Sequence, residues 1–271
     1  MSATAPIKRR AQVDIVEGAQ TSRTRRALLA VIAVTAVLAV WAALSGLGFV
    51  NHVLVPSPAD VARAAAAALR DGSLAKNTAA SLLRVVEGFG VAVLVAMPLG
   101  IAMGISSTTR GLLEPLIELL RPVPPIAFIP LAILWFGIGE TSKVMIIAYG
   151  AFFPIFINTM AGLADVDLVH IRAAQTLGAK RYDLFKDVVL PSAFPQMVTG
   201  ARLGMGMAFI VLVAAELVAS SEGLGYLIND ARFSFRTDQI FVGIITIGLL
   251  GLALNKGLLE AERRLLRWKF L

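Results

Sequence analysis

The chain of 271 residues contains no cysteine and only two histidines. Without cysteine it has no disulfide framework, no thiolate metal site and no cysteine nucleophile. His52 and His170 are the remaining soft ligands, and neither has a second ligand close to it in the sequence. These absences argue against a metalloenzyme, and we predict no metal site.

Charge is also scarce. Only 16% of residues are charged, 57% are hydrophobic, and the mean hydropathy is +0.78. A soluble domain of this size does not normally carry so much apolar surface, so we expect an integral membrane protein in a lipid bilayer. The net charge of +7 then needs no nucleic-acid partner, because Lys and Arg gather in the cytoplasmic loops of membrane proteins.

Sequence motifs for catalysis are missing as well. There is no GxxxxGK phosphate loop, no nucleophile with a base at usable spacing, and no histidine cluster. We therefore predict no catalytic residue and no cofactor within this chain.

Six apolar segments are long enough to cross a membrane as helices. The first is free of charge and about 33 Å long as a helix, while Arg84 and Glu87 lie near the outer end of the second. The expected spans are residues 27–48, 78–104, 111–137, 143–163, 195–220 and 240–259.

The polar segments set the expected orientation. Basic residues concentrate in the tail 1–26, the turn at Arg110, the loop 165–191 and the C-terminal tail 260–271, which places both termini in the cytoplasm. Residues 49–77 form an outer segment with a short Ala-rich helix, and residues 221–239 form an outer loop with a short helix. The five-span core is expected over residues 78–259.

The third expected span is irregular. One unbroken helix cannot hold all of its prolines, which are Pro115, Pro122, Pro124, Pro125 and Pro130. A broken helix at membrane depth is tolerated where it lines a cavity or packs in protein.

The loop 165–191 predicts two short helices. Asp167 is a good N-cap, and Gly178 supplies the left-handed turn that stops the first helix. A second helix from Lys180 to Val189 is expected to end at Pro191. Periodicity alone leaves open whether this helical hairpin lies on its own protein, on lipid, or in a partner.

Residue identity narrows that choice. The string RAAQTLGAKRYDLFKDVVLP resembles the cytoplasmic loop of ABC importer permeases. Ala173, Ala174 and Gly178 stand at the positions of the family motif, and the string ends in Val-Leu-Pro where the motif ends in an apolar residue, Leu and Pro. Arg172 departs from the Glu of many members, but the taurine and sulfonate branch often carries Arg there. A second string, ELLRPVPPIAFIPLAILWFGIGETSK, resembles the taurine importer permeases.

The resemblance implies a type I ABC importer permease fold, all-α with six transmembrane helices and a broken third span, in the bacterial inner membrane. It implies a homodimer, two cytoplasmic ATP-binding subunits that hold ATP and Mg, and a periplasmic or lipid-anchored solute-binding protein. The ATPase-docking residues it implies are Arg172, Ala173, Ala174, Leu177, Gly178, Ala179, Tyr182 and Phe185.

The substrate that the resemblance implies first is taurine or another small organosulfonate, with nitrate, alkanesulfonates and small heterocycles as alternatives. An ion-coupled secondary transporter is a rival, but such folds often have paired broken helices and only one broken span is found here. An intramembrane enzyme would need buried His, Asp or Cys in at least two spans.

Three ionisable residues inside expected spans are candidates for the substrate path, since such groups usually face a cavity or a partner: Arg121, Arg202 and Glu216. Arg121 can instead pair with Glu118, three residues earlier. Glu216 either faces the path near the outer gate or pairs with the outer loop. The residues expected to contact the binding protein are Gly223, Gly225, Arg232 and Arg236.

Overall fold

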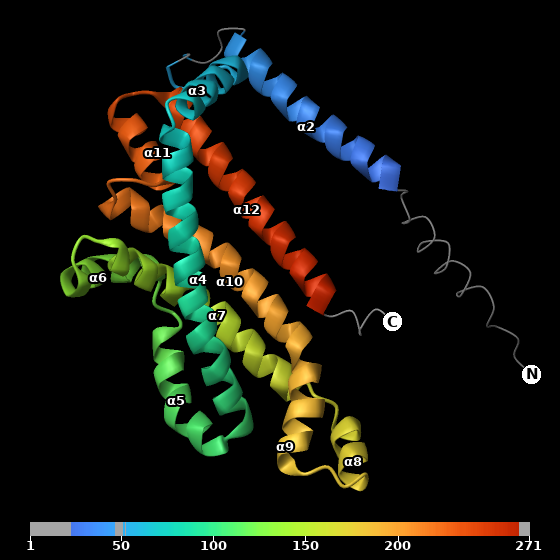
Figure 1. The fold of residues 1–271 in the computed structure, drawn as a ribbon. Coiled ribbons are helices and arrows are strands. Elements are labelled where there is room, and N and C mark those ends of the chain that lie inside the picture. Colours follow the sequence, from blue (N-terminus) through green and yellow to red (C-terminus); the bar gives the residue numbers. More distant parts are fainter. Residues whose placement is uncertain (1–22, 47–50, 52, 266–271) are drawn as a thin grey trace, which may run out of the picture. The chain divides into compact units, whose positions relative to one another are not determined.

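The computed structural model describes residues 23–46, 51 and 53–265, and every regular element in these ranges is helical (Figure 1). The chain forms two compact units, residues 1–61 and 62–271. Five helices in the described part are long and apolar enough to cross a membrane, or six if one bent pair counts as a span.

The first unit contains α2 (Arg23–Gly46) and the start of α3 (Pro58–Arg70). The Trp41 indole donates a hydrogen bond to the Pro56 carbonyl, 3.0 Å away. Residues 47 and 48, with which the predicted first span ends, lie outside the described residues, as do most of the predicted N-terminal tail and the last six residues of the C-terminal tail.

The second unit is built around three long helices, α4 (Ser73–Ile105), α7 (Glu140–Ala164) and α10 (Leu190–Ala219). Both α4 and α10 pack along α7, and α12 (Thr237–Leu265) lies beside α10 (Figure 1). Small residues permit the close contact: a Cβ at Gly204 would lie 2.7 Å from Ile155 Cγ1. A Cβ at Gly206, in contrast, would have no atom within 4 Å.

The third span is broken, as its prolines predict. Helix α5 (Ser107–Leu120) is followed by a 3-10 turn (Pro125–Phe128) and α6 (Ile129–Phe136), and the two arms meet at 88°. Pro122 and Pro124 lie in the break itself, where Val123 N donates to the carbonyl of Leu120, three residues earlier, at 3.0 Å, and the α-helical pattern of bonds four residues apart stops.

The polar loop forms the helical hairpin that its sequence predicts. Asp167 Oδ1 accepts a hydrogen bond from Val169 N at 2.8 Å at the start of α8 (Leu168–Thr176), and Gly178 has a φ of 86°. The second arm is α9 (Arg181–Asp183) and the π-helical η2 (Leu184–Val189).

The predicted stop at Pro191 is wrong, because η2 runs directly into α10. Leu190 N donates to the carbonyl of Phe185, five residues earlier, so the helix is widened just before the proline. Pro191 directly follows this widened turn, and the π-helical geometry accommodates its ring and its missing N–H within the continuous helix.

The second unit has two distinct ends (Figure 1). The hairpin of α8 and α9 lies at one end, together with the turn between α4 and α5. Helix α11 (Leu224–Phe233) lies at the opposite end. We call these the α8 end and the α11 end.

Candidate functional site

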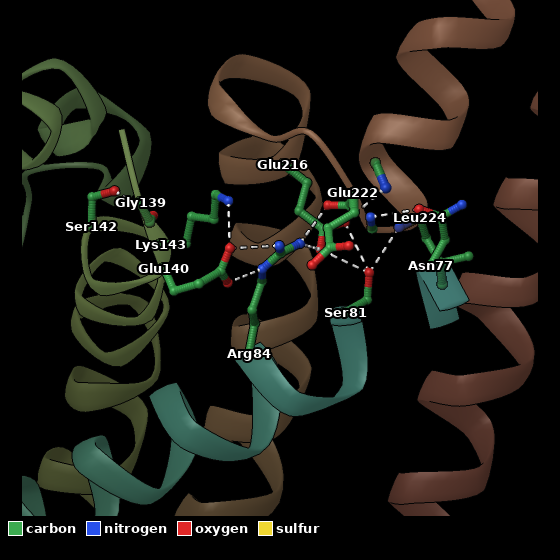
Figure 2. Close-up of polar contacts among 12 residues, drawn as sticks. Asn77, Ser81, Arg84, Gly139, Glu140, Ser142, Lys143, Glu216, Glu222 and Leu224 are labelled. Atoms are coloured by element: carbon green, nitrogen blue, oxygen red, sulfur yellow. Dashed lines mark hydrogen bonds and ion pairs between the residues drawn. The ribbon is translucent and has the colours of Figure 1, made fainter. Parts of the chain in front are cut away.

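At the α11 end, polar side chains from three long helices meet inside the protein (Figure 2). They form a network of hydrogen bonds and ion pairs that includes both fully buried and partly exposed groups. We call this network the ion cluster; it consists of Asn77, Ser81 and Arg84 of α4, Glu140 and Lys143 of α7, and Glu216 of α10.

Arg84 is the centre of the ion cluster, with a side chain only 1% exposed. Its Nη1 lies 2.7 Å from Glu216 Oε1, while Nε and Nη2 contact the two carboxylate oxygens of Glu140 at 2.5 and 2.8 Å. Nη1 also donates to the carbonyl of Glu222 at 2.6 Å. One planar guanidinium therefore links α4, α7, α10 and the segment before α11.

Glu216 has no exposed side-chain surface and is held by several donors besides Arg84. Ser81 Oγ lies 2.7 Å from its Oε1, and Gly225 N lies 2.7 Å from its Oε2. A Cβ at Gly225 would lie 2.6 Å from the Glu216 Cβ, so only glycine fits this approach.

The first turn of α11 is capped by side chains of other helices. Gly223 N donates to Asn77 Oδ1 at 2.7 Å, and Leu224 N donates to Ser81 Oγ at 2.8 Å. With the bond from Gly225 N to Glu216, three successive N–H groups have acceptors. A carboxylate at a helix N-terminus is also favoured by the helix dipole, so the cluster fixes both the position and the direction of α11.

The ion cluster contains two cations, Arg84 and Lys143, and two anions, Glu140 and Glu216. The desolvation cost of each buried charge is offset by an opposite charge in direct contact. Removing Arg84 alone would leave the Glu216 carboxylate buried without a cation.

The three residues expected on the substrate path occupy different places. Glu216 is in the ion cluster, while Arg202 of α10 forms an ion pair with Glu262 of α12. Arg121 is exposed at the end of α5, and the described structure has no ion pair between it and Glu118. The structure therefore does not bring these three residues together.

The residues expected to contact a binding protein divide into two groups. Gly223 and Gly225 are buried against the ion cluster. Arg232 and Arg236 are exposed at the far end of α11; Arg232 lies over the Phe233 ring, and Arg236 pairs with Asp230 at 2.8 Å.

The expected docking residues surround the turn of the hairpin. Leu177 is 88% exposed and Tyr182 is 71% exposed. Arg172, Ala173 and Gly178 are exposed as well, whereas Ala174, Ala179 and Phe185 are half-buried. We call this set of eight residues the hairpin tip.

Sequence reasoning missed most of the ion cluster. Arg84 was noted only as a charge near the end of a span, and Asn77, Ser81, Glu140 and Lys143 were given no role. A signal was present: Asn77, Ser81 and Arg84 follow one another at spacings of four and three, which places three polar residues on one helix face.

The sequence and fold match known transport proteins. Residues 96–258 match the family described as binding-protein-dependent transport system inner membrane component. The chain is 46% identical to the taurine transport system permease protein TauC of Escherichia coli K12 over 73% of this chain and 72% of that protein. It is 38% identical to the putative aliphatic sulfonates transport permease protein SsuC of Bacillus subtilis 168, covering 83% and 82%.

A solved structure has the same fold. An inward-facing MetNI methionine ABC transporter chain aligns with a TM-score of 0.51 at 17% identity, over 66% of this chain and 93% of that chain. At this identity the likeness concerns the fold alone. The chain therefore belongs to the family of inner membrane components of binding-protein-dependent transport systems, and has the type I ABC importer permease fold.

Proposed function

We propose that this chain is the permease subunit of an ATP-driven importer that carries a small organosulfonate, with taurine as the first candidate. The observation that supports this most is the 46% identity to a taurine permease over nearly three quarters of both chains. Alkanesulfonates are the second candidate, because the aliphatic sulfonate permease is 38% identical. Nitrate and small heterocycles are further alternatives within the same importer class.

The hairpin tip is proposed to lie in the cytoplasm and to dock an ATP-binding subunit. Leu177 and Tyr182 expose most of their apolar surface there, which is unfavourable in water and favourable in a partner's groove. The small residues Ala173, Gly178 and Ala179 allow that groove to approach the backbone. ATP and Mg are then bound by the partner subunit.

Each chain carries one hairpin, while ATP-binding subunits act in pairs. Two copies of this chain related by a twofold axis are therefore the simplest assembly. Both termini are proposed to lie in the cytoplasm, on the side of the hairpin tip.

The α11 end is proposed to face outward and to receive the solute-binding protein. Arg232 and Arg236 are exposed there and offer positive charge to an acidic partner surface. Glu216 is proposed to act on the substrate path indirectly, because its contacts fix α11 and leave it no exposed surface.

Uptake of [35S]taurine tests the proposal. We expect deletion of the gene in its own host to abolish uptake, and reintroduction to restore it, while growth on sulfate stays normal. Uptake should fall when cellular ATP is depleted at constant membrane potential. Unchanged taurine and alkanesulfonate uptake in the deletion strain would refute the organosulfonate assignment, and dependence on an ion gradient alone would favour a secondary transporter.

A further inference from the structure

A second polar feature adjoins the ion cluster. A cavity of about 450 Å³ lies between the link from α6 to α7, the first turn of α7, and residues 218–221 at the end of α10. Its lining includes Glu140, Lys143 and Ser220, whereas the two apolar pockets near the α5–α6 break are lined by no charged residue. We call this cavity the α7–α10 pocket.

Two side chains of this pocket, Lys143 and Ser220, have N–H or O–H groups that lack acceptors among the described residues. The Lys143 side chain is 5% exposed, and its ammonium has one polar partner in the described structure, Glu140 Oε1 at 2.9 Å. An ammonium has three N–H donors, so two remain. The hydroxyl of Ser220 is buried without any hydrogen-bond partner among the described residues.

The start of α7 adds to this donor character. Gly139 is its N-cap residue and provides no side-chain acceptor for the first N–H groups of the helix. Gly139 also lines the α7–α10 pocket. The positive end of the helix dipole therefore favours an anionic group in the same place as the two side-chain donors.

An acceptor lies beside these donors. The Glu140 side chain is 57% exposed, and its two oxygens accept three hydrogen bonds, from Arg84 twice and from Lys143 once. A carboxylate has about four acceptor sites, so Glu140 can also accept from a ligand ammonium. The pocket thus offers donors to an anion and, a short distance away, a carboxylate to a cation.

We propose that the α7–α10 pocket binds the transported solute itself, and that its ligand class is a short zwitterion with a sulfonate and an ammonium group, such as a 2-aminoalkanesulfonate. The sulfonate oxygens accept from Lys143 and Ser220, and the ammonium donates to Glu140. The volume lies within the ordinary range of small-molecule sites. This inference rests on the proposed function and assigns it a site within the permease.

Direct binding tests the site without the ATP-binding subunits. The purified permease in lipid nanodiscs is titrated with taurine and with ethanesulfonate, which lacks the ammonium, by saturation-transfer NMR. We expect the wild type to bind both and taurine more tightly. Ser220→Ala should raise the apparent Kd of each about three- to tenfold, and Lys143→Met at least tenfold.

Two matched variants serve as controls. Ser234→Ala changes an exposed serine at the end of α11, and Lys76→Met changes an exposed lysine that pairs with Glu222. Both should leave the Kd within about twofold of the wild type. If Lys143→Met does not fold, Ser220→Ala decides, since the Ser220 hydroxyl has no partner whose loss would unfold the protein.

The outcomes separate this site from the transport function. Wild-type affinity in Ser220→Ala, or no taurine binding by the wild type, would overturn the site even if cells take up taurine. Binding that responds to both substitutions, in a permease that transports no sulfonate in cells, would refute the proposed function and leave the site standing.

Discussion

Arg84 is a cation almost wholly enclosed by protein, and it contacts carboxylates from two other helices. Replacing a whole buried cluster of charges by apolar side chains often changes the free energy of unfolding little. Removing one charge alone is costly, because its partner stays buried without an opposite charge. The side chain thus acts mainly to specify how α4, α7 and α10 meet at the α11 end.

Replacement of Arg84 by Met should lower the free energy of unfolding by about 3–5 kcal/mol, because Glu216 would remain buried without its cation. The thermal midpoint of the purified permease, followed by size-exclusion chromatography after heating, measures this loss. Arg84→Met combined with Glu216→Gln should be more stable than Arg84→Met alone, since the orphaned charge is gone.

The exposed pair Lys76–Glu222, 3.1 Å apart, provides the control. Lys76→Met should change stability by no more than about 0.5 kcal/mol, because exposed ion pairs contribute little. Equal effects of Lys76→Met and Arg84→Met would contradict the central role of Arg84.

At the scale of elements, the sequence predicted those helix ends and breaks that depend on residues close together in the chain. Asp167 and Gly178 form the predicted cap and turn because a short side chain and a missing Cβ act within a few residues. The prolines of residues 111–137 also act locally, because each lacks an N–H and crowds the preceding turn, and the third span is broken as predicted. Pro191 failed as a stop signal, because whether a helix tolerates proline depends on the π-helical turn before it.

The ion cluster could not be predicted in this way. Arg84 meets Glu140 and Glu216, which are separated from it by 56 and 132 positions. No period or spacing in one segment contains that information; it depends on how three long helices pack. The sequence marked Glu216 as costly in a membrane, but only the fold identifies its partners.

The hairpin tip should be needed for coupling and not for assembly. Gly178→Val leaves free space around the new side chain but imposes a strained φ, at a local cost of about 1 kcal/mol or more. We expect the variant to reach the membrane at wild-type levels while ATPase activity stimulated by loaded binding protein collapses.

Gly111→Val is the matched control for this change. Gly111 lies near the same end of the unit, in α5, with free space around it and no positive φ. Its stimulated ATPase activity should stay close to that of the wild type. Normal stimulation in Gly178→Val would remove the docking role.

Helix α11 and the residues just after it should contact the binding protein through their exposed charges. Arg236→Ser is expected to raise the concentration of binding protein needed for half-maximal ATPase stimulation at low ionic strength, where the Debye length is about 30 Å. The difference from wild type should shrink at high salt, because exposed charges are then screened.

Arg110→Ser controls for the loss of an exposed arginine elsewhere, since Arg110 faces Glu114 near the turn between α4 and α5. It should not alter the dependence on binding protein. An Arg236→Ser effect that is the same at low and high salt would exclude an electrostatic contact.

At the scale of the whole molecule, the second unit places its two proposed partner-binding regions, the hairpin tip and α11, at opposite ends. Helices α8 and α9, which carry the hairpin tip, lie at one end, and α11 lies at the other (Figure 1). The first turn of α11 contacts the ion cluster. A permease needs such a division, because ATP hydrolysis and solute delivery occur on opposite sides of the membrane. The proposed partners therefore require the α8 end to face the cytoplasm and the α11 end to face outward.

The absence of cysteine makes that sidedness directly measurable. Thr176→Cys at the α8 end and Ser234→Cys at the α11 end each introduce one thiol at an exposed position. A membrane-impermeant maleimide added to intact spheroplasts should label Cys at 234 within minutes, and should label Cys at 176 only after the membrane is permeabilised. The basic residues around the hairpin favour this orientation, since they resist translocation.

The wild type should remain unlabelled in both conditions, and retained taurine uptake would establish that each variant is folded. Labelling in the reverse order would place the hairpin tip outside, where no ATP-binding subunit can reach it, and both partner assignments would fall together.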